Sequence, residues 1–477
     1  MNPFLIAKFM GWLLLGLSAM ELLPMIAALI FGEPILPYAA SAMAALVCGL
    51  PIVIGVRITD TRMRIRDGFL VVVSAWVLAS VFGSLPYDLT DTLDPVDALF
   101  ESVSGFTTTG STVMTHIDGV PRALLLWRSI TQWIGGMGII LFAVAVMPLL
   151  GIGGMRLFKA EVPGPVADKL TPRIAVTARR LWFIYVGFTV IEWILLMVAG
   201  MTPYQALCHA LTTMSTGGYS TEDKSIGGFN SPLVEWVIIV FMVLASINFV
   251  LHYRILTGRI QSALADAELR YYLLLLACAT GIVAWVLSGT GEMTSVRVAL
   301  FQVVSVVTTT GYATADFETW PSLALLVILQ LMFLGGMAGS TSGGVKSLRT
   351  LIGFRTLANV FARLGHRSAV GHPVRYGGKP VTNRTLAGIW AFLVAYISIV
   401  AVVALIVTAA GYDFITAVTA ALTAVGNVGP GLGEVGPFDN FAHFSAIVKL
   451  TLCGAMIAGR LELFTVLILF HPEFWRR

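Results

Sequence analysis

Four short segments rich in hydroxyl groups and glycine recur at regular intervals between long apolar stretches. They read Thr107-Thr108-Thr109-Gly110, Met214-Ser215-Thr216-Gly217, Thr308-Thr309-Thr310-Gly311 and Gly426-Asn427-Val428-Gly429. Backbone carbonyl oxygens of such segments can coordinate an alkali cation when they surround a common axis inside a membrane. Four similar segments in one chain can surround such an axis, so they predict a path for an alkali cation.

We expect two carbonyl groups in each segment to bind the ion. They belong to Thr108 and Thr109, Ser215 and Thr216, Thr309 and Thr310, and Asn427 and Val428. Because backbone atoms do the binding, the side chains can change to those of Asn and Val in the fourth segment. Glycine adopts a positive φ at little cost. The expected hinges are therefore Gly110, Gly217, Gly311 and Gly429.

The composition places these segments in a membrane protein. The chain has 477 residues, of which 57% are hydrophobic and 12% are charged, with a mean hydropathy of +0.86. Soluble domains carry about 25% charged residues. Many stretches stay apolar over the roughly 20 residues that a membrane-spanning helix needs. The predicted fold class is an all-α polytopic membrane protein.

The positions of the charges predict the topology. Basic residues gather in alternate connections, for example at residues 57–66, 156–180 and 346–384, whereas the connections that hold the four segments are acidic. By the positive-inside rule the basic connections and both termini lie in the cytoplasm. A basic face can also mark a nucleic-acid-binding protein, but a charge bias between membrane loops indicates topology, so no nucleic-acid partner is expected.

The chain divides into an N-terminal two-helix hairpin and four units of similar plan. In each unit a membrane helix is followed by a short helix, the polar segment and a second membrane helix. The short helices, at 94–106, 203–213, 294–307 and 414–425, cannot cross a bilayer and are expected to be re-entrant, around one ion pore. The predicted boundaries are 1–66 for the hairpin and 67–160, 161–260, 261–375 and 376–477 for the units, giving ten spans in all.

These segments resemble the TrkH family of potassium uptake proteins, which is related to KtrB and to the plant HKT transporters. The resemblance includes Ser104–Gly110, Ser215–Ser220, Thr309–Ala313 and Ala424–Gly431, and extends to Gln132–Gly138 and Leu157–Glu161. It implies potassium as the transported ion, since glycine stands at all four places. No cofactor is expected in this chain. It also implies a homodimer, a cytosolic TrkA-type nucleotide-binding partner and a location in the bacterial cytoplasmic membrane.

Two further features are expected to gate the pore. Arg460 is predicted to lie mid-helix in the last span, where a buried charge is costly and faces a cavity or a partner. We expect it to form a positive barrier below the filter; the alternatives are an ion pair with Glu462 or an extended side chain that reaches the cytoplasmic face. The second feature is a glycine-rich run that interrupts the second span of the third unit, which we expect to be a loop under the filter, with Lys346 near the cytoplasmic mouth. The run comprises Gly335, Gly336, Met337, Ala338, Gly339, Ser340, Thr341, Ser342, Gly343 and Gly344.

Two other readings compete with a gated pore. A proton- or sodium-coupled potassium symporter on the same pore would need an acidic residue on the ion route, for which Glu21 and Glu192 are intramembrane candidates. An intramembrane enzyme would need a nucleophile–base or metal-ligand set, which the sequence does not offer. Arg128 is expected to have a structural role, paired with an acid such as Glu101.

Overall fold

The computed structural model describes residues 1–57, 64–145, 170–289, 295–365, 373–377 and 379–476. The predicted boundary between the first and second units, at residues 160/161, lies outside these residues. The same holds for the segment 157–161 and for residues 146–150, in which we expected the second membrane helix of the first unit to end.

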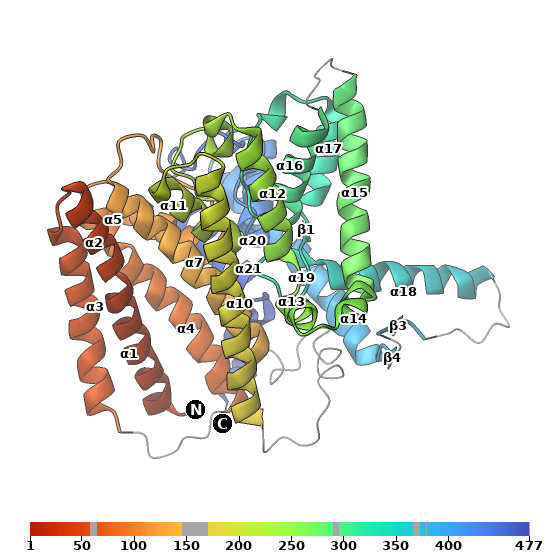
Figure 1. The fold of residues 1–477 in the computed structure, drawn as a ribbon. Helices are drawn as coiled ribbons and strands as arrows, with labels where there is room; N and C mark the ends of the chain where they lie inside the picture. Colours follow the sequence, from red (N-terminus) through yellow and green to blue (C-terminus); the bar gives the residue numbers. More distant parts are fainter. Residues whose placement is uncertain (58–63, 146–169, 290–294, 366–372, 378, 477) are drawn as a thin grey trace.

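Helices make up most of the described chain (Figure 1). In order they are α1 (Pro3–Met20), α2 (Leu22–Phe31), α3 (Leu36–Gly55), α4 (Ile65–Gly83), α5 (Leu85–Leu89), α6 (Pro95–Phe106), α7 (Arg122–Ala145), α10 (Leu170–Val198), α11 (Pro203–Met214), η2 (Ser225–Phe229), α12 (Pro232–Ser246), α13 (Phe249–Leu256), α14 (Ile260–Leu264), α15 (Ala267–Ser288), α16 (Ser295–Val307), η3 (Phe317–Thr319), α17 (Ser322–Leu331), α18 (Ser347–Gly365), α19 (Asn383–Ala409), α20 (Phe414–Gly426), α21 (Ala446–Arg460), α22 (Phe464–Leu467), η4 (Ile468–Phe470) and α23 (Pro472–Trp475).

Strands are confined to two short pairs in the described residues. β1 (Leu334–Gly335) pairs in parallel with β2 (Val345–Lys346), and β3 (Arg375–Tyr376) pairs antiparallel with β4 (Lys379–Pro380). The fold is the predicted all-α membrane fold, and the first strand pair closes the base of the glycine-rich run.

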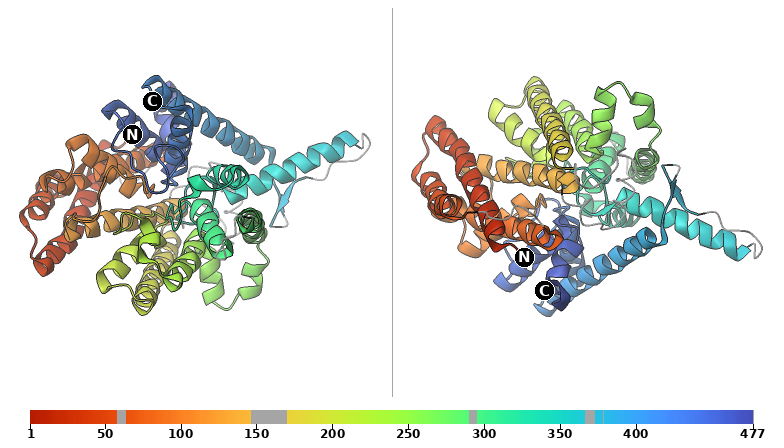
Figure 2. Two further views of the ribbon diagram at one scale, coloured as in Figure 1. Left: turned by 90° about the horizontal axis from the view of Figure 1, so that it is seen from above. Right: turned by 90° about the horizontal axis from the view of Figure 1, so that it is seen from below.

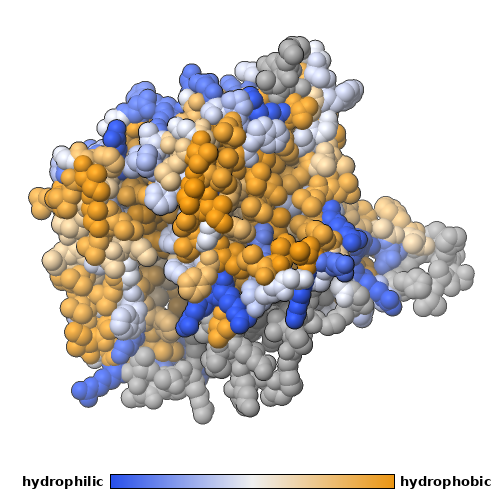
Figure 3. All heavy atoms as spheres, in the orientation of Figure 1, coloured by the Kyte–Doolittle hydropathy of each residue, from blue (hydrophilic) through white to orange (hydrophobic). Residues whose placement is uncertain are grey.

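The molecule has the surface of a multi-pass membrane protein. Among the described residues, seven helices are long and apolar enough to cross a membrane, or up to nine if each of two bent helix pairs counts as one span. Their outward faces form an apolar belt between more polar ends (Figure 3). Both termini lie at the same end of this belt (Figure 1), as the predicted topology requires.

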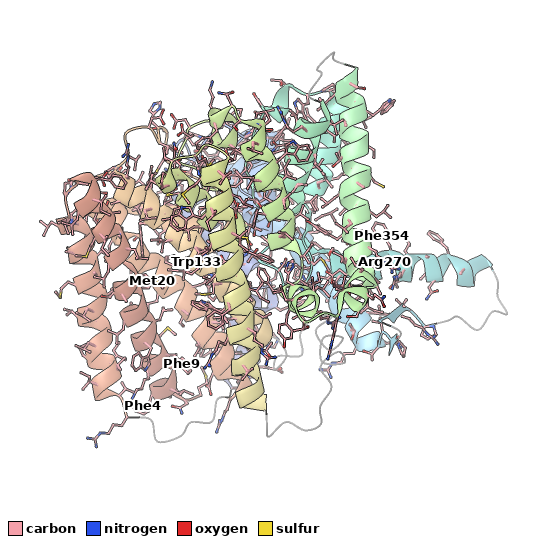
Figure 4. The ribbon with its side chains drawn as sticks, viewed as in Figure 1. Phe4, Phe9, Met20, Trp133, Arg270 and Phe354 are labelled. Atoms are coloured by element: carbon pink, nitrogen blue, oxygen red, sulfur yellow. The ribbon has the colours of Figure 1, made fainter. Side chains whose placement is uncertain are left out.

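The four units are arranged around one centre. Seen along the belt axis, they follow one another around the molecule in chain order, with the N-terminal hairpin of α1 to α3 outside the first unit (Figure 2). At the lower end of α15, Arg270 lies beside α18, which projects from the bundle and carries Phe354 (Figure 4).

Each unit contributes one short helix that ends inside the bundle, as predicted. These pore helices are α6, α11, α16 and α20. Proline at the first position starts α6 and α11, where a missing N–H costs nothing. Asp413 caps α20 by accepting hydrogen bonds from the N–H groups of Ile415 and Thr416, at 2.9 and 3.1 Å.

Three membrane spans are broken: two were predicted to be continuous, and the third was predicted to be interrupted. The helices α12 and α13 meet at 100°, and α21 and the segment from Phe464 meet at 110°. Asn248 caps α13 and so favours a new helix after the first bend, while Glu462 and Leu463 have positive φ and end α21. In the third unit, α17 stops at Leu331 and the chain enters the glycine-rich run.

Candidate ion-conducting site

All four pore helices end with the same backbone turn. A residue other than glycine takes a left-handed conformation, with φ of 52° at Thr108, 53° at Thr216, 58° at Thr309 and 53° at Asn427. The N–H of the following residue then bonds back to a carbonyl oxygen five residues earlier, as in Thr109 to Ser104 at 2.9 Å and Val428 to Thr423 at 3.0 Å. This is the bonding of a Schellman helix end, which normally uses glycine. The shared turn gives the four loops one register.

The register corrects the predicted alignment of the second loop. Gly217 occupies the position of Thr109, Thr310 and Val428, because its N–H bonds to the carbonyl oxygen of Thr212 at 2.8 Å. The glycine with positive φ is Gly218, at 78°, and not the predicted hinge Gly217. The other three hinges are confirmed as positive-φ glycines, at 84° for Gly110, 80° for Gly311 and 102° for Gly429. Ser215, which was predicted to bind the ion, lies one residue before the position of Thr108, Thr309 and Asn427, at the end of its pore helix.

The four hinge glycines form a closed ring of backbone contacts. A Cβ atom added to Gly110 would lie 2.3 Å from the carbonyl oxygen of Gly217, and one added to Gly218 would lie 1.8 Å from that of Thr310. The same test places Gly311 2.2 Å from the oxygen of Val428, and Gly429 2.8 Å from that of Thr109. In each unit the glycine thus contacts a carbonyl oxygen of the next unit, and the glycine of the fourth unit contacts a carbonyl oxygen of the first. We call the carbonyl groups of Thr109, Gly217, Thr310 and Val428 the carbonyl ring.

A cavity of about 360 Å³ opens above this ring, and all four hinge glycines line it. Its wall also carries the acidic residues Glu222, Asp223 and Asp439. Burial and the nearby Asp118 carboxylate raise the pKa of Glu222 above its usual range. The cavity is therefore a mouth that leads from one face of the protein to the ring.

The glycine-rich run lies against the inner side of the same loops, as predicted. The N–H of Gly343 donates to Thr309 Oγ1 at 2.7 Å, and Thr341 Oγ1 donates to the carbonyl oxygen of Met214 at 3.2 Å. A Cβ at Gly343 would lie 2.3 Å from the carbonyl oxygen of Gly426. The run therefore contacts three of the four pore-helix ends, and at Gly343 the approach is too close for a side chain.

Arg460 reaches this loop from the fourth unit. Its Nη1 donates to the carbonyl oxygen of Thr341 at 2.6 Å and its Nη2 to that of Gly135 at 3.2 Å. The side chain is buried, so it does not extend to the surface. The predicted mid-helix position is corrected, since Arg460 is the last residue of α21 at the bend. A cation there is favoured by the partially negative end of the helix.

Glu462 is not the partner of Arg460. Its carboxylate instead forms an ion pair with Arg349, which follows the glycine-rich loop on α18 and lies over the ring of Phe392. Lys346 is buried at the end of the loop, where its Nζ donates to the carbonyl oxygen of Ser342. The C-terminal end of the loop therefore belongs to a packed charged region below the filter loops.

The other buried charges separate into paired and unpaired groups. Arg128 and Glu101 form the expected pair at 2.6 Å, with the guanidinium 3.6 Å from the centre of the Tyr219 ring. Glu21 accepts a hydrogen bond from Ser41 at 2.8 Å, far from the ring in the N-terminal hairpin. Glu192 is fully buried on α10, and its carboxylate oxygens lack a hydrogen-bond partner among the described residues.

Sequence reasoning missed two residues of this site. Gln132 on α7 bonds to the second loop, and Glu268 on α15 bonds to Ala338 in the glycine-rich run and to Ser347 just after it. Trp133, which follows Gln132, lies at mid-depth in the bundle (Figure 4). A polar amide in a predicted membrane helix, just before Gly135 and Gly136, is the sequence signal that could have pointed to Gln132.

Comparison with known proteins identifies the same plan elsewhere. The family model for TrkH, described as cation transport protein, matches residues 53–477. The Trk system potassium uptake protein TrkH of Salmonella typhimurium is 38% identical over 480 residues, covering 99% of each chain, and that of Halomonas elongata is 39% identical over 496 residues, covering 100% of each. The crystal structure of the potassium transporter TrkH from Vibrio parahaemolyticus superposes with a TM-score of 0.92 at 36% identity over 100% of both chains.

Proposed function

Because the chain belongs to the TrkH family of cation transport proteins, we propose that it takes up potassium through the carbonyl ring. The family is one of transporters, not of enzymes. The single observation that carries the proposal is the cyclic contact of the four hinge glycines with the carbonyl groups of the neighbouring units. Backbone carbonyl groups around an axis can replace the hydration shell of a potassium ion.

The filter in this proposal uses backbone groups from two residues of each loop. They are Thr108 and Thr109, Thr216 and Gly217, Thr309 and Thr310, and Asn427 and Val428, which moves the second pair one residue on from Ser215 and Thr216. Thr108 Oγ1, Ser342 Oγ and Asn427 Oδ1 are buried near the filter without a hydrogen-bond partner in the described chain. Buried polar atoms of this kind are normally satisfied by water or an ion, which supports a hydrated path here.

We propose that the glycine-rich loop and Arg460 close this path below the filter. The loop contacts the pore-helix ends, and Arg460 fixes the carbonyl group of Thr341 within it. Its positive charge repels a cation in a site of low dielectric constant. Opening would then require the Arg460–Thr341 bond to break and the loop to move.

The partners and location follow from the family. We propose a homodimer in the bacterial cytoplasmic membrane, with both termini in the cytoplasm and a TrkA-type nucleotide-binding partner on that side. The projecting helix α18 exposes Phe354, Phe361 and Leu364, an apolar surface suited to contact with a second copy. The relatives are named as parts of a Trk system, which supports a regulated complex.

Ion flux into liposomes tests this function. Purified protein should pass potassium in preference to sodium, and the flux should follow the potassium gradient at either of two imposed pH gradients. Gly218→Ala should abolish it, because the new Cβ would meet the Thr310 carbonyl oxygen at 1.8 Å. The matched control is Gly187→Ala on α10, where the added Cβ has open space.

Two results would contradict the proposal. Equal potassium and sodium flux in the wild type would exclude a selective filter. Potassium movement against its own gradient, driven by protons or sodium, would establish the symporter reading, in which case the unpartnered carboxylate of Glu192 becomes the first residue to replace.

A further inference from the structure

Gly217 stands where the other three loops carry a side chain. Its equivalents are Thr109, Thr310 and Val428, and its φ is not positive, so backbone conformation does not require glycine there. The reason is a neighbour. A Cβ at Gly217 would lie 2.3 Å from both Cδ and Oε1 of Gln132, so this side chain occupies the space.

Gln132 holds the second loop at two points. Its Nε2 donates to the carbonyl oxygen of Gly217 at 2.7 Å, and its Oε1 accepts from the N–H of Tyr219 at 3.2 Å. The amide is fully buried, so water does not compete for these bonds. The two contacts flank Gly218, and together they fix the orientation of the peptide groups on either side of that hinge.

The helix that carries Gln132 is itself fixed against the pore helices. On α7, a Cβ at Gly135 would lie 2.0 Å from the carbonyl oxygen of Phe106, and one at Gly136 would lie 2.8 Å from Cα of Ser215. The backbone of α7 is therefore in direct contact with the ends of the first two pore helices. The position of Gln132 is therefore fixed by the packing of α7, and its two hydrogen bonds restrain the second loop relative to that helix.

This restraint makes the carbonyl ring asymmetric. The Gly217 oxygen is the ring oxygen that faces Gly110, and within the described part of the chain it is the only one of the four that accepts a side-chain hydrogen bond. A carbonyl oxygen has two lone pairs, so one remains for an ion. Selectivity among alkali cations depends on the size of the site and on the number and field strength of its carbonyl dipoles.

We propose that Gln132 is a specificity-determining positioning residue of the filter, which holds the Gly217 carbonyl group at the distance that suits potassium and prevents it from closing on sodium. The inference rests on the proposed potassium function. Gln132 does not touch the ion. It acts by limiting the inward movement of one carbonyl group and by drawing part of its electron density toward the amide.

The test compares potassium and sodium fluxes in liposomes for the wild type and Gln132→Met, a residue of similar length without hydrogen bonds. The potassium-to-sodium flux ratio should fall by about three- to tenfold, the range that one hydrogen bond spans, while potassium flux persists. Gln302→Met is the control, since Gln302 is an equally buried glutamine whose Nε2 lies 3.4 Å from the Tyr312 carbonyl oxygen, outside the ring.

A second variant covers the case in which Gln132→Met fails to fold. The double change Gln132→Ala with Gly217→Ala moves side-chain volume from α7 to the loop and removes both hydrogen bonds. It should fold and should show the same loss of selectivity. An unchanged flux ratio in whichever variant folds would overturn the inference, as would a fall in both fluxes with the ratio preserved.

The failure of this inference is distinct from failure of the proposed function. A wild type that prefers potassium, beside variants that prefer it equally, would reject the role of Gln132 alone. A wild type without any preference would reject the potassium filter, and with it the role of Gln132.

Discussion

Arg460 Nη1 lies 2.6 Å from the carbonyl oxygen of Thr341, so the fourth unit holds the loop of the third in place directly below the filter. The guanidinium also reaches the carbonyl oxygen of Gly135 in the first unit at 3.2 Å. One buried side chain thus joins three of the four units. Its position makes it the residue whose removal should most affect the closed state.

Replacing Arg460 with Ala should raise potassium flux into liposomes. The change removes a positive charge and two charge-assisted hydrogen bonds, each of which contributes about 1.5–3 kcal/mol. Even a loss of about 1.4 kcal/mol from the barrier corresponds to a tenfold faster flux. The potassium flux of Arg460→Lys should lie between those of the wild type and Arg460→Ala, because lysine keeps the charge but lacks the planar guanidinium group. Equal flux in all three proteins would exclude Arg460 as a barrier.

Glu268 should hold the glycine-rich loop closed from the opposite side. Its Oε1 accepts from the N–H of Ala338 and from Ser347 Oγ, both at 2.8 Å, so one oxygen joins the loop to the start of α18. Glu268→Ala should increase potassium leak and hydrogen exchange of the loop. Glu268→Gln keeps an accepting oxygen and should behave as the wild type. A leak in Glu268→Gln as large as that in Glu268→Ala would show that charge, not the hydrogen bonds, is what matters.

Thr108→Asn should stabilise the protein. Thr108 has a φ of 52° and its Oγ1 lacks a partner in the described chain, whereas the fourth loop already has Asn427 in the same conformation. A strained left-handed residue costs about 1–3 kcal/mol, and asparagine tolerates this region better than threonine. We expect a gain of about 1 kcal/mol in the free energy of unfolding, measured as a higher melting temperature in detergent.

Thr309→Asn is the matched control for that gain. Thr309 shares the left-handed φ, at 58°, but its Oγ1 accepts a hydrogen bond from Gly343 at 2.7 Å. The substitution disturbs this bond while it relieves the backbone, so the melting temperature should rise less than for Thr108→Asn. The reverse order would argue against backbone strain as the cause.

Acidification on the side of the mouth cavity should slow potassium influx. Burial and Asp118 raise the pKa of Glu222, so this carboxylate becomes neutral at a higher pH than an ordinary one. As the pH falls, Glu222 is protonated before an ordinary carboxylate would be, so the mouth loses negative charge and attracts fewer cations. Glu222→Gln should lower influx at neutral pH and flatten its pH dependence. An unaltered pH profile in this variant would place the sensitive group elsewhere.

The sequence predicted the pore helices and the glycine-rich loop well, because local signals mark them. Proline starts α6 and α11, Asp413 caps α20, and consecutive glycines exclude a long helix after α17. The register of the second loop was wrong because Gly217 and Gly218 are adjacent and only one is a hinge. The other is glycine on account of Gln132, which lies 85 residues away, so the residues around Gly217 do not reveal the cause.

The bends of the membrane helices could not be read from hydropathy. Residues 246–249 and 460–464 contain neither glycine nor proline, and the apolar stretch continues through both. The first bend is held by tertiary contact, since the N–H of Phe249 donates to the carbonyl oxygen of Gly339 at 3.2 Å. The second places Arg460 at a helix end instead of mid-helix. The first bend thus depends in part on a long-range contact, which hydropathy sums do not include.

The closure of the carbonyl ring has a consequence for biosynthesis. The last contact joins Gly429 to the Thr109 carbonyl group, and Asn427 Nδ2 bonds to Thr109 Oγ1 at 2.9 Å across 318 residues of chain. Contacts between such distant residues form late in folding. A nascent chain that is halted before its fourth unit cannot complete the carbonyl ring. A ribosome that stalls before that point therefore leaves no complete potassium filter in the membrane.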